Sequence, residues 1–522
     1  MARAYLEKKL FLWAALGIAA GMLLCLGAAP LYLEEPRRAL IALEMFHSGN
    51  YWAATQFGEW YYYKPPVFNW VLVLFARLGG GFDEFWLRLP TVLSVWGMAA
   101  LLWAAGRRWV GSYFGWVSAL TFLSFGSILF YFSALAEIDL FYALIVWAGL
   151  LAVYYFGEKE RYLWLFLSAY LSCAIGVLTK GMPSFAFTAI SLLVYFVDKG
   201  RFRVLLSAKH FMGIALLALL LGGYVWQYRA YNDPLFLIGT LFGESSERSI
   251  GHSFGEFVAH LLAFPFDFLK DLLPLALLGV FLLRSDVRSL LLERHPFIRF
   301  CVLMLLSNIV LYWLSPGTRM RYVYPLFPFA ALLLAWAWER RAEAPVWAGR
   351  FFHTALVFLC VLSALGLAVL PLVPDLAFLS YRWALAVLGA TGFAGLAVWV
   401  YQRPRYALAG LFLALALGRI AFDLSVLPLR AKSGEAASNK ALAEKIYALT
   451  GDAPLYYYGE PKVLPFTTGF YLSRLRSRPV VLQDQLRRGS FYLLPAEQAG
   501  KKDSVWLETM YNDTAKVLIL RK

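Results

Sequence analysis

Acidic, basic and aromatic side chains are concentrated in one stretch that follows the first apolar run of the chain. Leu33 to Pro66 reads LEEPRRALIALEMFHSGNYWAATQFGEWYYYKPP. A carboxylate such as Glu34 or Glu35 can act as a general base towards a hydroxyl group. A cation such as Lys64 can stabilise the charge that develops on a departing phosphate. This stretch therefore carries the parts of a group-transfer site.

Further ionisable residues and tyrosines lie at the ends of apolar runs. The candidates are the acid Asp139, the cations Arg37, Arg248, Lys180 and Arg319, which could bind a phosphate or an acceptor, and the tyrosines Tyr61, Tyr63 and Tyr322, which could bind a sugar. Aromatic rings offer flat apolar faces to sugar rings, and tyrosine hydroxyls add polar contacts. Charges close to membrane depth are costly, so they are functional candidates by default.

Each candidate also has a structural interpretation. Glu34 and Glu35 could cap an interfacial helix that begins at Pro36, and Lys64 could extend to lipid headgroups. Asp139 could pair with a nearby arginine, and the tyrosines could belong to an aromatic belt at the membrane surface. His252 and His260 are eight positions apart, which does not favour a metal site.

The composition requires a membrane protein. Hydrophobic residues make up 61% of the 522 and charged residues only 16%, which is too little charge for the surface of a soluble enzyme. The net charge of +15 is attributed to basic cytoplasmic loops rather than to nucleic-acid binding. The four cysteines lie inside apolar runs without a CxxC pair, so no disulfide framework or zinc site is predicted.

The apolar runs predict an α-helical multi-pass membrane protein. A spanning helix needs roughly 20 mainly apolar residues. Thirteen runs are candidates: 10–30, 89–105, 113–133, 139–156, 162–179, 183–197, 210–228, 268–283, 297–314, 322–338, 351–371, 383–400 and 406–423. The segments 36–47 and 67–78 are assigned to amphipathic helices at the membrane interface.

Loop charges predict the orientation. With the N-terminus in the cytoplasm, every inner loop carries at least two Lys or Arg residues, as the positive-inside rule requires. Thirteen crossings then place the C-terminus outside, together with the candidate site residues. From about residue 425 the chain alternates between helical patterns, at 433–451 and 462–474, and strand patterns, at 453–459, 477–483 and 514–520, which predicts a small extracytoplasmic α/β domain over 425–522.

The outer face of a membrane has no nucleotide pool, so an activated group must arrive there on a lipid carrier. In this context the motifs EEPRRALIALEM, YYYKPP, LRLPT, AEIDLF, LTKGMP and RYVYPLFP, in this order, resemble those of the GT-C membrane glycosyltransferases. Among these they are most similar to the bacterial aminoarabinose lipid A transferases and the protein O-mannosyltransferase-like group. The family has an Asp-Glu pair after its first helix, whereas this chain has Glu34 and Glu35.

The resemblance implies roles for particular residues. Glu34 takes the position of the proposed base, with Glu35 as the alternative. Lys64 matches the lysine that contacts the carrier phosphate. Asp139 matches the second acid, and Tyr322 and Arg248 match a tyrosine and a loop arginine of the family. Some relatives use a divalent cation, but the spacing of the acids here does not demand one.

The resemblance also gives the expected activity. Residues 1–424 would form a transmembrane glycosyltransferase domain with the outer loop 31–88, and residues 425–522 the outer domain. The enzyme would transfer a sugar from a polyprenyl-phosphate donor to lipid A or another envelope lipid or glycan, at the outer face of a bacterial inner membrane. The alternatives are a protein O-glycosyl or oligosaccharyl transferase, and a flippase for lipid-linked sugars. A flippase predicts charges at helix midplanes and repeated halves, which the sequence lacks.

Overall fold

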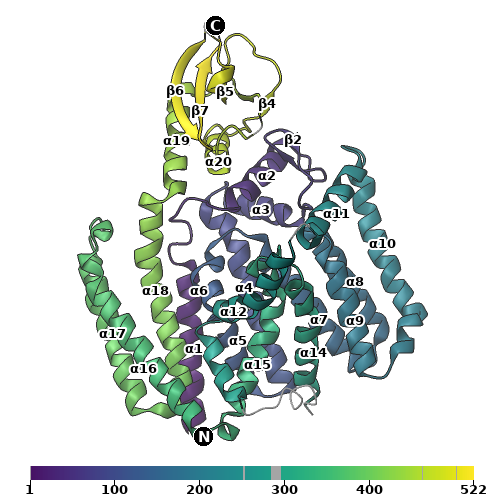
Figure 1. Ribbon diagram of the computed structural model, residues 1–522, viewed down its shortest axis with the longest axis vertical. Coiled ribbons are helices and arrows are strands. Elements are labelled where there is room, and N and C mark those ends of the chain that lie inside the picture. Colours follow the sequence, from purple (N-terminus) through teal and green to yellow (C-terminus); the bar gives the residue numbers. More distant parts are fainter. Residues whose placement is uncertain (1, 251–252, 284–294, 461, 501–502, 522) are drawn as a thin grey trace.

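The computed structural model describes residues 2–250, 253–283, 295–460, 462–500 and 503–521. Long helices run along the longest axis of the molecule, and a small sheet sits at one end of them, beyond the short helices α2 (Glu35–Ser48) and α3 (Val67–Leu78) (Figure 1). The start of α1 (Ala2–Leu23) lies at the opposite end (Figure 1).

Within the described residues, nine helical segments are long and apolar enough to cross a membrane. They are Glu84–Trp109 (α4), Ile138–Gly157 (α7), Tyr162–Lys180 (α8), Ala208–Tyr228 (α10), Pro296–Trp313 (α14), Met320–Glu339 (η4 and α15), Val346–Leu372 (α16 and η6), Arg382–Gln402 (α17) and Pro404–Ser433 (η8 and α18). A helix pair bent by 54°, Ser112–Leu123 (α5) and Gly126–Ala134 (α6 and η1), would make a tenth. The chain is therefore a multi-pass membrane protein.

Three of the thirteen expected spans do not meet this criterion. Of the segment 10–30, only residues 10–23 belong to α1, whose first half carries Glu7, Lys8 and Lys9. The segment 183–197 forms α9 (Pro183–Asp198), which has only 16 residues. The segment 268–283 is interrupted between α12 (Phe254–Asp271) and the 3-10 helix η3 (Leu275–Leu282), because Pro274 lies at the break. A count of thirteen crossings stays a prediction.

The two segments that were expected to be interfacial helices are α2 and α3. Helix α2 ends at Gly49, whose φ of 71° is in the left-handed region that glycine adopts without strain. Most residues of α2 are buried, because the helix packs against α3 on one side and α20 (Phe466–Leu475) of the C-terminal region on the other. A short hairpin, β1 (Thr55–Gln56) and β2 (Glu59–Trp60), connects α2 to α3.

The C-terminal region contains a five-stranded sheet in the order β4-β3-β5-β7-β6. Strands β3 (Leu455–Tyr458), β4 (Leu482–Gln483) and β7 (Thr514–Leu520), and helices α19 (Glu435–Thr450) and α20, lie where the sequence predicted them. Strands β5 (Phe491–Pro495) and β6 (Ser504–Tyr511) were not predicted. β5 is the central strand, with four of its five residues buried, and such short apolar runs lack the alternation that marks a half-exposed strand.

The membrane region and the C-terminal region share packing. α18 (Ala407–Ser433) is followed by α19 after a single residue, Gly434. The Phe57 ring, from the loop between α2 and α3, stacks on Phe466 at 5.7 Å between centroids, and its backbone carbonyl accepts a hydrogen bond of 2.9 Å from the backbone N–H of Leu482. The C-terminal region is therefore fixed on the polar loop of the membrane region, and a boundary at residue 424 stays a prediction.

The remaining helices complete the membrane region. They are α11 (Pro234–Ile250) and the 3-10 helices η2 (Phe202–Leu206), η5 (Arg341–Glu343) and η7 (Pro374–Leu376), with η9 (Ala496–Gln498) in the C-terminal region. Helix α10 and the pair α16 and α17 lie at the periphery of the bundle (Figure 1). Their side chains leave large apolar surfaces exposed, as expected for helices that face lipid.

Candidate active site

A cleft of about 280 Å³ opens where α2, α7, α8 and η4 meet beneath the C-terminal region. Nine of the eleven residues that the sequence singled out line it: Glu34, Arg37, Tyr61, Tyr63, Lys64, Asp139, Lys180, Arg319 and Tyr322. Arg38, Glu137, Ile138 and Arg321 complete the lining. Six basic side chains thus face three carboxyl groups, so the cleft suits a negatively charged ligand.

Glu34 occupies the N-cap position of α2, two residues before Pro36 in the first turn. Its carboxylate pairs with Arg37, with Oε2 and Nη1 3.0 Å apart, and both side chains remain about 30% exposed. The Arg37 guanidinium lies 4.6 Å from the centroid of the Phe466 ring. Glu34 therefore sits at the rim of the cleft, where water and substrate can reach it.

A buried pair forms the floor of the cleft. Asp139, in the first turn of α7, accepts a hydrogen bond from Nζ of Lys180, the last residue of α8. The Lys180 ammonium also lies 4.4 Å from the centroid of the Tyr322 ring. Arg321 approaches the other oxygen of Asp139 at 3.7 Å. The start of α7, the end of α8 and the turn before α15 are thereby held together.

Glu137 is a cleft residue that was absent from the predicted site. It is 1% exposed, and its nearest cation is Arg321, at 3.4 Å between Oε1 and Nη1. Burial, together with the adjacent Asp139 carboxylate, raises the pKa of Glu137 to about 8. The signal in the sequence was the spacing of two acids in AEIDLF, which brings both carboxyl groups to the same end of one helix.

Arg38 is the second cleft residue of this kind. It is 5% exposed, and its Nη1 donates a hydrogen bond of 3.1 Å to the Tyr61 hydroxyl. Tyr61 is buried, whereas Tyr63 is 54% exposed, and the two rings lie 5.7 Å apart. The cleft consequently offers one anchored and one accessible tyrosine, with Lys64 following directly in the sequence.

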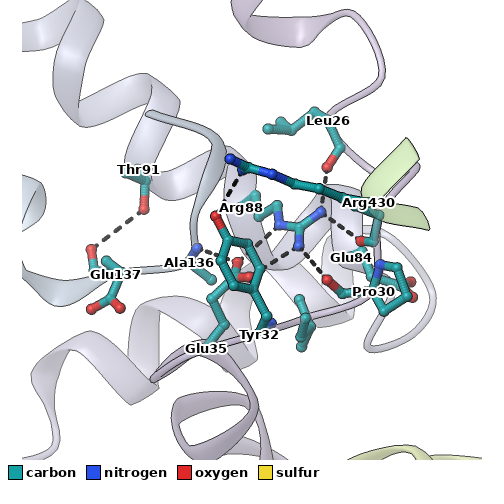
Figure 2. A network of polar contacts seen from close by, with 12 residues as sticks. Leu26, Pro30, Tyr32, Glu35, Glu84, Arg88, Thr91, Ala136, Glu137 and Arg430 are labelled. Carbon is teal, nitrogen blue, oxygen red and sulfur yellow. Dashed lines mark hydrogen bonds and ion pairs between the residues drawn. The ribbon is translucent and has the colours of Figure 1, made fainter. Parts of the chain in front are cut away.

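Glu35, in contrast, does not line the cleft. Its side chain is fully buried and pairs with Arg88, at 2.8 Å between Oε1 and Nε. It also accepts hydrogen bonds from the backbone N–H groups of Ala136 (2.6 Å) and Tyr32 (3.1 Å). Figure 2 shows the Arg88 guanidinium between Glu35 and the carbonyls of Leu26 and Pro30. With both oxygens occupied in this way, Glu35 has no group available for a substrate proton.

The network continues into the C-terminal region. Glu84, one turn before Arg88 on α4, accepts a hydrogen bond of 2.8 Å from the Tyr471 hydroxyl. Lys440 and Arg474 pair with the same carboxylate at 3.1 and 3.0 Å. Tyr471 also accepts a hydrogen bond from the backbone N–H of Leu31 at 2.8 Å. These contacts connect α19 and α20 to the turn that presents Glu34.

The remaining predictions concern Arg248 and a metal. Arg248 belongs to α11, in the part (residues 244–250) whose side chains lie outside the described residues, as does His252. His260 faces the backbone carbonyl of Tyr312 at 3.1 Å. Among the described residues, no three His, Cys, Asp or Glu side chains are grouped as metal ligands.

Comparisons with known proteins agree with this architecture. Residues 63–226 match the sequence family described as dolichyl-phosphate-mannose-protein mannosyltransferase. An undecaprenyl phosphate-alpha-4-amino-4-deoxy-L-arabinose arabinosyl transferase of Pseudomonas paraeruginosa is 28% identical over 387 residues, which are 72% of this chain and 68% of the relative. The corresponding protein of Pseudomonas savastanoi is 32% identical over 190 residues, or 35% of each chain.

Solved structures share the fold over nearly the full length. The crystal structure of ArnT from Cupriavidus metallidurans bound to undecaprenyl phosphate superposes with a TM-score of 0.71 and 18% identity, covering 97% of both chains. The apo state of the same protein gives a TM-score of 0.69 at 18% identity, with 99% of this chain and 98% of that chain covered.

The helical bundle, the C-terminal sheet and the charged cleft are those of an integral-membrane glycosyltransferase, and part of the membrane region matches the mannosyltransferase family. Within this class the chain is related to the bacterial aminoarabinose transferases, as the order of its motifs indicated.

Proposed function

We propose that the enzyme transfers a sugar from a polyprenyl-phosphate donor to an acceptor lipid, with lipid A as the first candidate, at the outer face of the bacterial inner membrane. The observation that carries the proposal is the cleft, where six basic side chains surround three carboxyl groups close to the membrane region. The named relatives use an undecaprenyl-phosphate-linked aminoarabinose, so a sugar of this kind is the donor to test first.

The reaction is a single displacement at the anomeric carbon. An acceptor hydroxyl attacks the anomeric carbon, the bond between that carbon and the phosphate oxygen breaks, and the bonding electrons leave with the polyprenyl phosphate. Glu34 receives or orients the hydroxyl proton, because it is the carboxylate at the accessible rim. Attack opposite to the leaving group inverts the configuration of the sugar.

The basic side chains of the cleft hold the departing phosphate. Lys64 and Arg319 lie among the lining residues, and Arg319 is exposed. Cations placed in advance around developing negative charge lower the barrier without reorganising during the reaction. Asp139 pairs with Lys180 and positions it within the floor of the cleft. Arg248 is retained as a phosphate-binding proposal on the basis of the resemblance alone.

The topology belongs to the same proposal. The N-terminus is cytoplasmic, the chain crosses the membrane thirteen times, and the C-terminal α/β region from about residue 425 lies outside. The bent pair α5 and α6 counts as one span in this scheme. Basic residues in every loop on the side of the N-terminus support it.

The test measures transfer by purified enzyme from a labelled undecaprenyl-phosphate aminoarabinose to lipid A. We expect Glu34→Gln to lower kcat on the order of 10² to 10⁴-fold, and Lys64→Ala to lower it on the order of 10² to 10³-fold. Glu59→Gln and Arg77→Gln change charge in the same outer loop but outside the cleft, so they serve as controls. Full activity of both Glu34→Gln and Lys64→Ala would refute the mechanism. Label recovered in protein or in a lipid-linked oligosaccharide would redirect the assignment of the acceptor.

A further inference from the structure

A second cavity, of about 460 Å³, lies between the membrane region and the C-terminal region. We call it the boundary cavity. Its walls come from the turn before α2, the turn after α6, the end of α18, the start of α19, the segment before α20 with the first turn of that helix, and β6. Its lining consists of Ala29, Pro30, Tyr32, Leu33, Tyr131, Arg430, Gly434, Glu435, Ala436, Asn439, Lys462, Pro465, Phe466, Thr467 and Tyr511.

Two cations in this cavity pair with no carboxylate among the residues that the structure describes. Arg430 donates a hydrogen bond of 3.0 Å to the Tyr32 hydroxyl, and its guanidinium lies 5.7 Å from the centroids of the Tyr32 and Tyr131 rings. Figure 2 shows Arg430 against Tyr32. The Lys462 ammonium lies 4.8 Å from the Phe466 centroid and 5.8 Å from that of Tyr511. Aromatic rings hold both charges in place but do not neutralise them.

The remaining lining fits an anionic carbohydrate. Glu435 is the one carboxylate in the lining, and it is exposed. The first turn of α19 also faces the cavity through Gly434, Glu435 and Ala436, and the N-terminal end of a helix carries partial positive charge. Tyrosine and phenylalanine rings provide faces for sugars, and Asn439 and Thr467 provide hydrogen-bonding groups. The volume is within the usual range for sites that bind small ligands, about 300 to 1,000 Å³.

The boundary cavity shares a wall with the catalytic cleft. Leu33 lines the cavity and the next residue, Glu34, lines the cleft. Arg37 lines the cleft, and its guanidinium lies 4.6 Å from the centroid of Phe466, which lines the cavity. A ligand in the boundary cavity therefore lies on the opposite side of the turn that carries the proposed base.

We propose that the boundary cavity binds the phosphate-bearing headgroup of the acceptor lipid, with Arg430 and Lys462 as ligands of a phosphate monoester. The inference rests on the proposed function and adds the place where the acceptor is recognised. Donor and acceptor approach Glu34 from two sides: the donor phosphate from the cleft, and the acceptor headgroup from the boundary cavity.

The experiment compares acceptor kinetics of Arg430→Gln and Lys462→Gln with those of two control variants. Lys432→Gln removes an exposed charge from the same end of α18, and Lys445→Gln removes one from α19. Neither control residue lines the cavity. We expect each cavity variant to raise the KM for bisphosphorylated lipid A by about tenfold or more, since a hydrogen bond to a charged group contributes about 1.5 to 3 kcal/mol. We expect kcat and the KM for the donor to stay within about twofold of wild type.

Dephosphorylated lipid A provides the second arm of the experiment. The wild type should bind it about as weakly as the cavity variants bind the phosphorylated lipid, and the variants should no longer distinguish the two lipids. Equal KM values of the wild type for both lipids would overturn the proposal. Unchanged acceptor KM in Arg430→Gln and Lys462→Gln would also overturn it.

A binding measurement separates this inference from the proposed function. Retention of bisphosphorylated lipid A by purified protein, followed by native mass spectrometry, needs no turnover. Binding by the wild type that is lost in both cavity variants supports the inference even if no sugar is transferred. Displacement by inorganic phosphate would show that a free phosphate is a sufficient ligand, and displacement only by the phosphorylated lipid would assign recognition to the whole headgroup. Equal retention by wild type and variants refutes the acceptor site.

Discussion

Glu34 and Glu35 are neighbours in the chain but belong to two different electrostatic environments. Glu35 lies in a closed network, where Arg88 and two backbone N–H groups satisfy its oxygens and water is excluded. Glu34 lies at the rim of an open cleft in which basic groups outnumber acids. In the closed network the charged groups hold chain segments together, whereas in the cleft the charged groups face a space that a ligand can enter.

This difference shows how one turn can serve two purposes. The first turn of a helix presents consecutive side chains about 100° apart, so adjacent acids point to different sides. Glu35 points to Arg88 and to the backbone of Ala136, and Glu34 points to the cleft. Because Glu35 binds the N–H of Ala136, it also positions the segment that carries Glu137 and Asp139. The neighbour of the proposed base thus helps to position the other two acids of the cleft.

The largest effect on stability is expected when the closed network loses its cation. Arg88→Gln leaves the Glu35 carboxylate buried without a counter-ion, which should lower the free energy of unfolding by about 3 to 5 kcal/mol. The control is Arg37→Gln, which breaks the half-exposed pair with Glu34 and should cost about 0 to 1 kcal/mol. Unfolding by denaturant in detergent micelles measures both. If the two variants lost equal stability, the distinction between a closed network and an open cleft would be wrong.

A smaller effect is expected at the contact between the two regions. Tyr471→Phe removes the hydroxyl that joins the backbone N–H of Leu31 to Glu84. Leaving these buried groups without their partner should cost about 1 to 3 kcal/mol. Tyr456→Phe is the matched control, because its hydroxyl has no hydrogen bond among the described residues. Loss of transfer activity by Tyr471→Phe at temperatures where it remains folded would show that the network also positions Glu34.

The last prediction concerns the pH dependence of stability and a single proton in the cleft. Burial and the adjacent Asp139 carboxylate raise the pKa of Glu137 in the folded protein, above the value of about 4.3 expected in the unfolded chain. Above that value the folded state binds more protons than the unfolded state, so this group makes stability fall as pH rises. Glu137→Gln should make the unfolding temperature depend less steeply on pH. An identical slope in wild type and Glu137→Gln would contradict the assignment.

Much of the cleft could be predicted because its residues share a topological position. Glu34, Lys64, Asp139, Lys180 and Tyr322 all lie at ends of apolar runs on the same side of the predicted bundle, and helices that cross one membrane bring such ends together. The helix 67–78 was predicted to the residue, since its apolar run is bounded by two prolines and by glycines. The ends of apolar runs and the boundaries of this helix are local features of the sequence, and the structure has them where the sequence predicted.

The roles that could not be predicted depend on contacts between distant positions. Glu35 is separated from Arg88 by 53 positions and from Ala136 by 101, so no local pattern distinguishes it from Glu34. The burial of Glu137 depends on its packing against η4, where Arg321 contacts it. The sequence around Glu137 does not predict this packing. The same holds for β5 and β6, whose place in the sheet depends on pairing with β7.

The single residue between α18 and α19 couples the boundary cavity to the tilt of a membrane helix. Gly434 joins α18 to α19 and also lines the boundary cavity. Helices tilt when the thickness of the bilayer changes, and a tilt of α18 would move Arg430 relative to Lys462 across that junction. The proposed acceptor site therefore predicts that acceptor affinity varies with the acyl-chain length of the surrounding lipids.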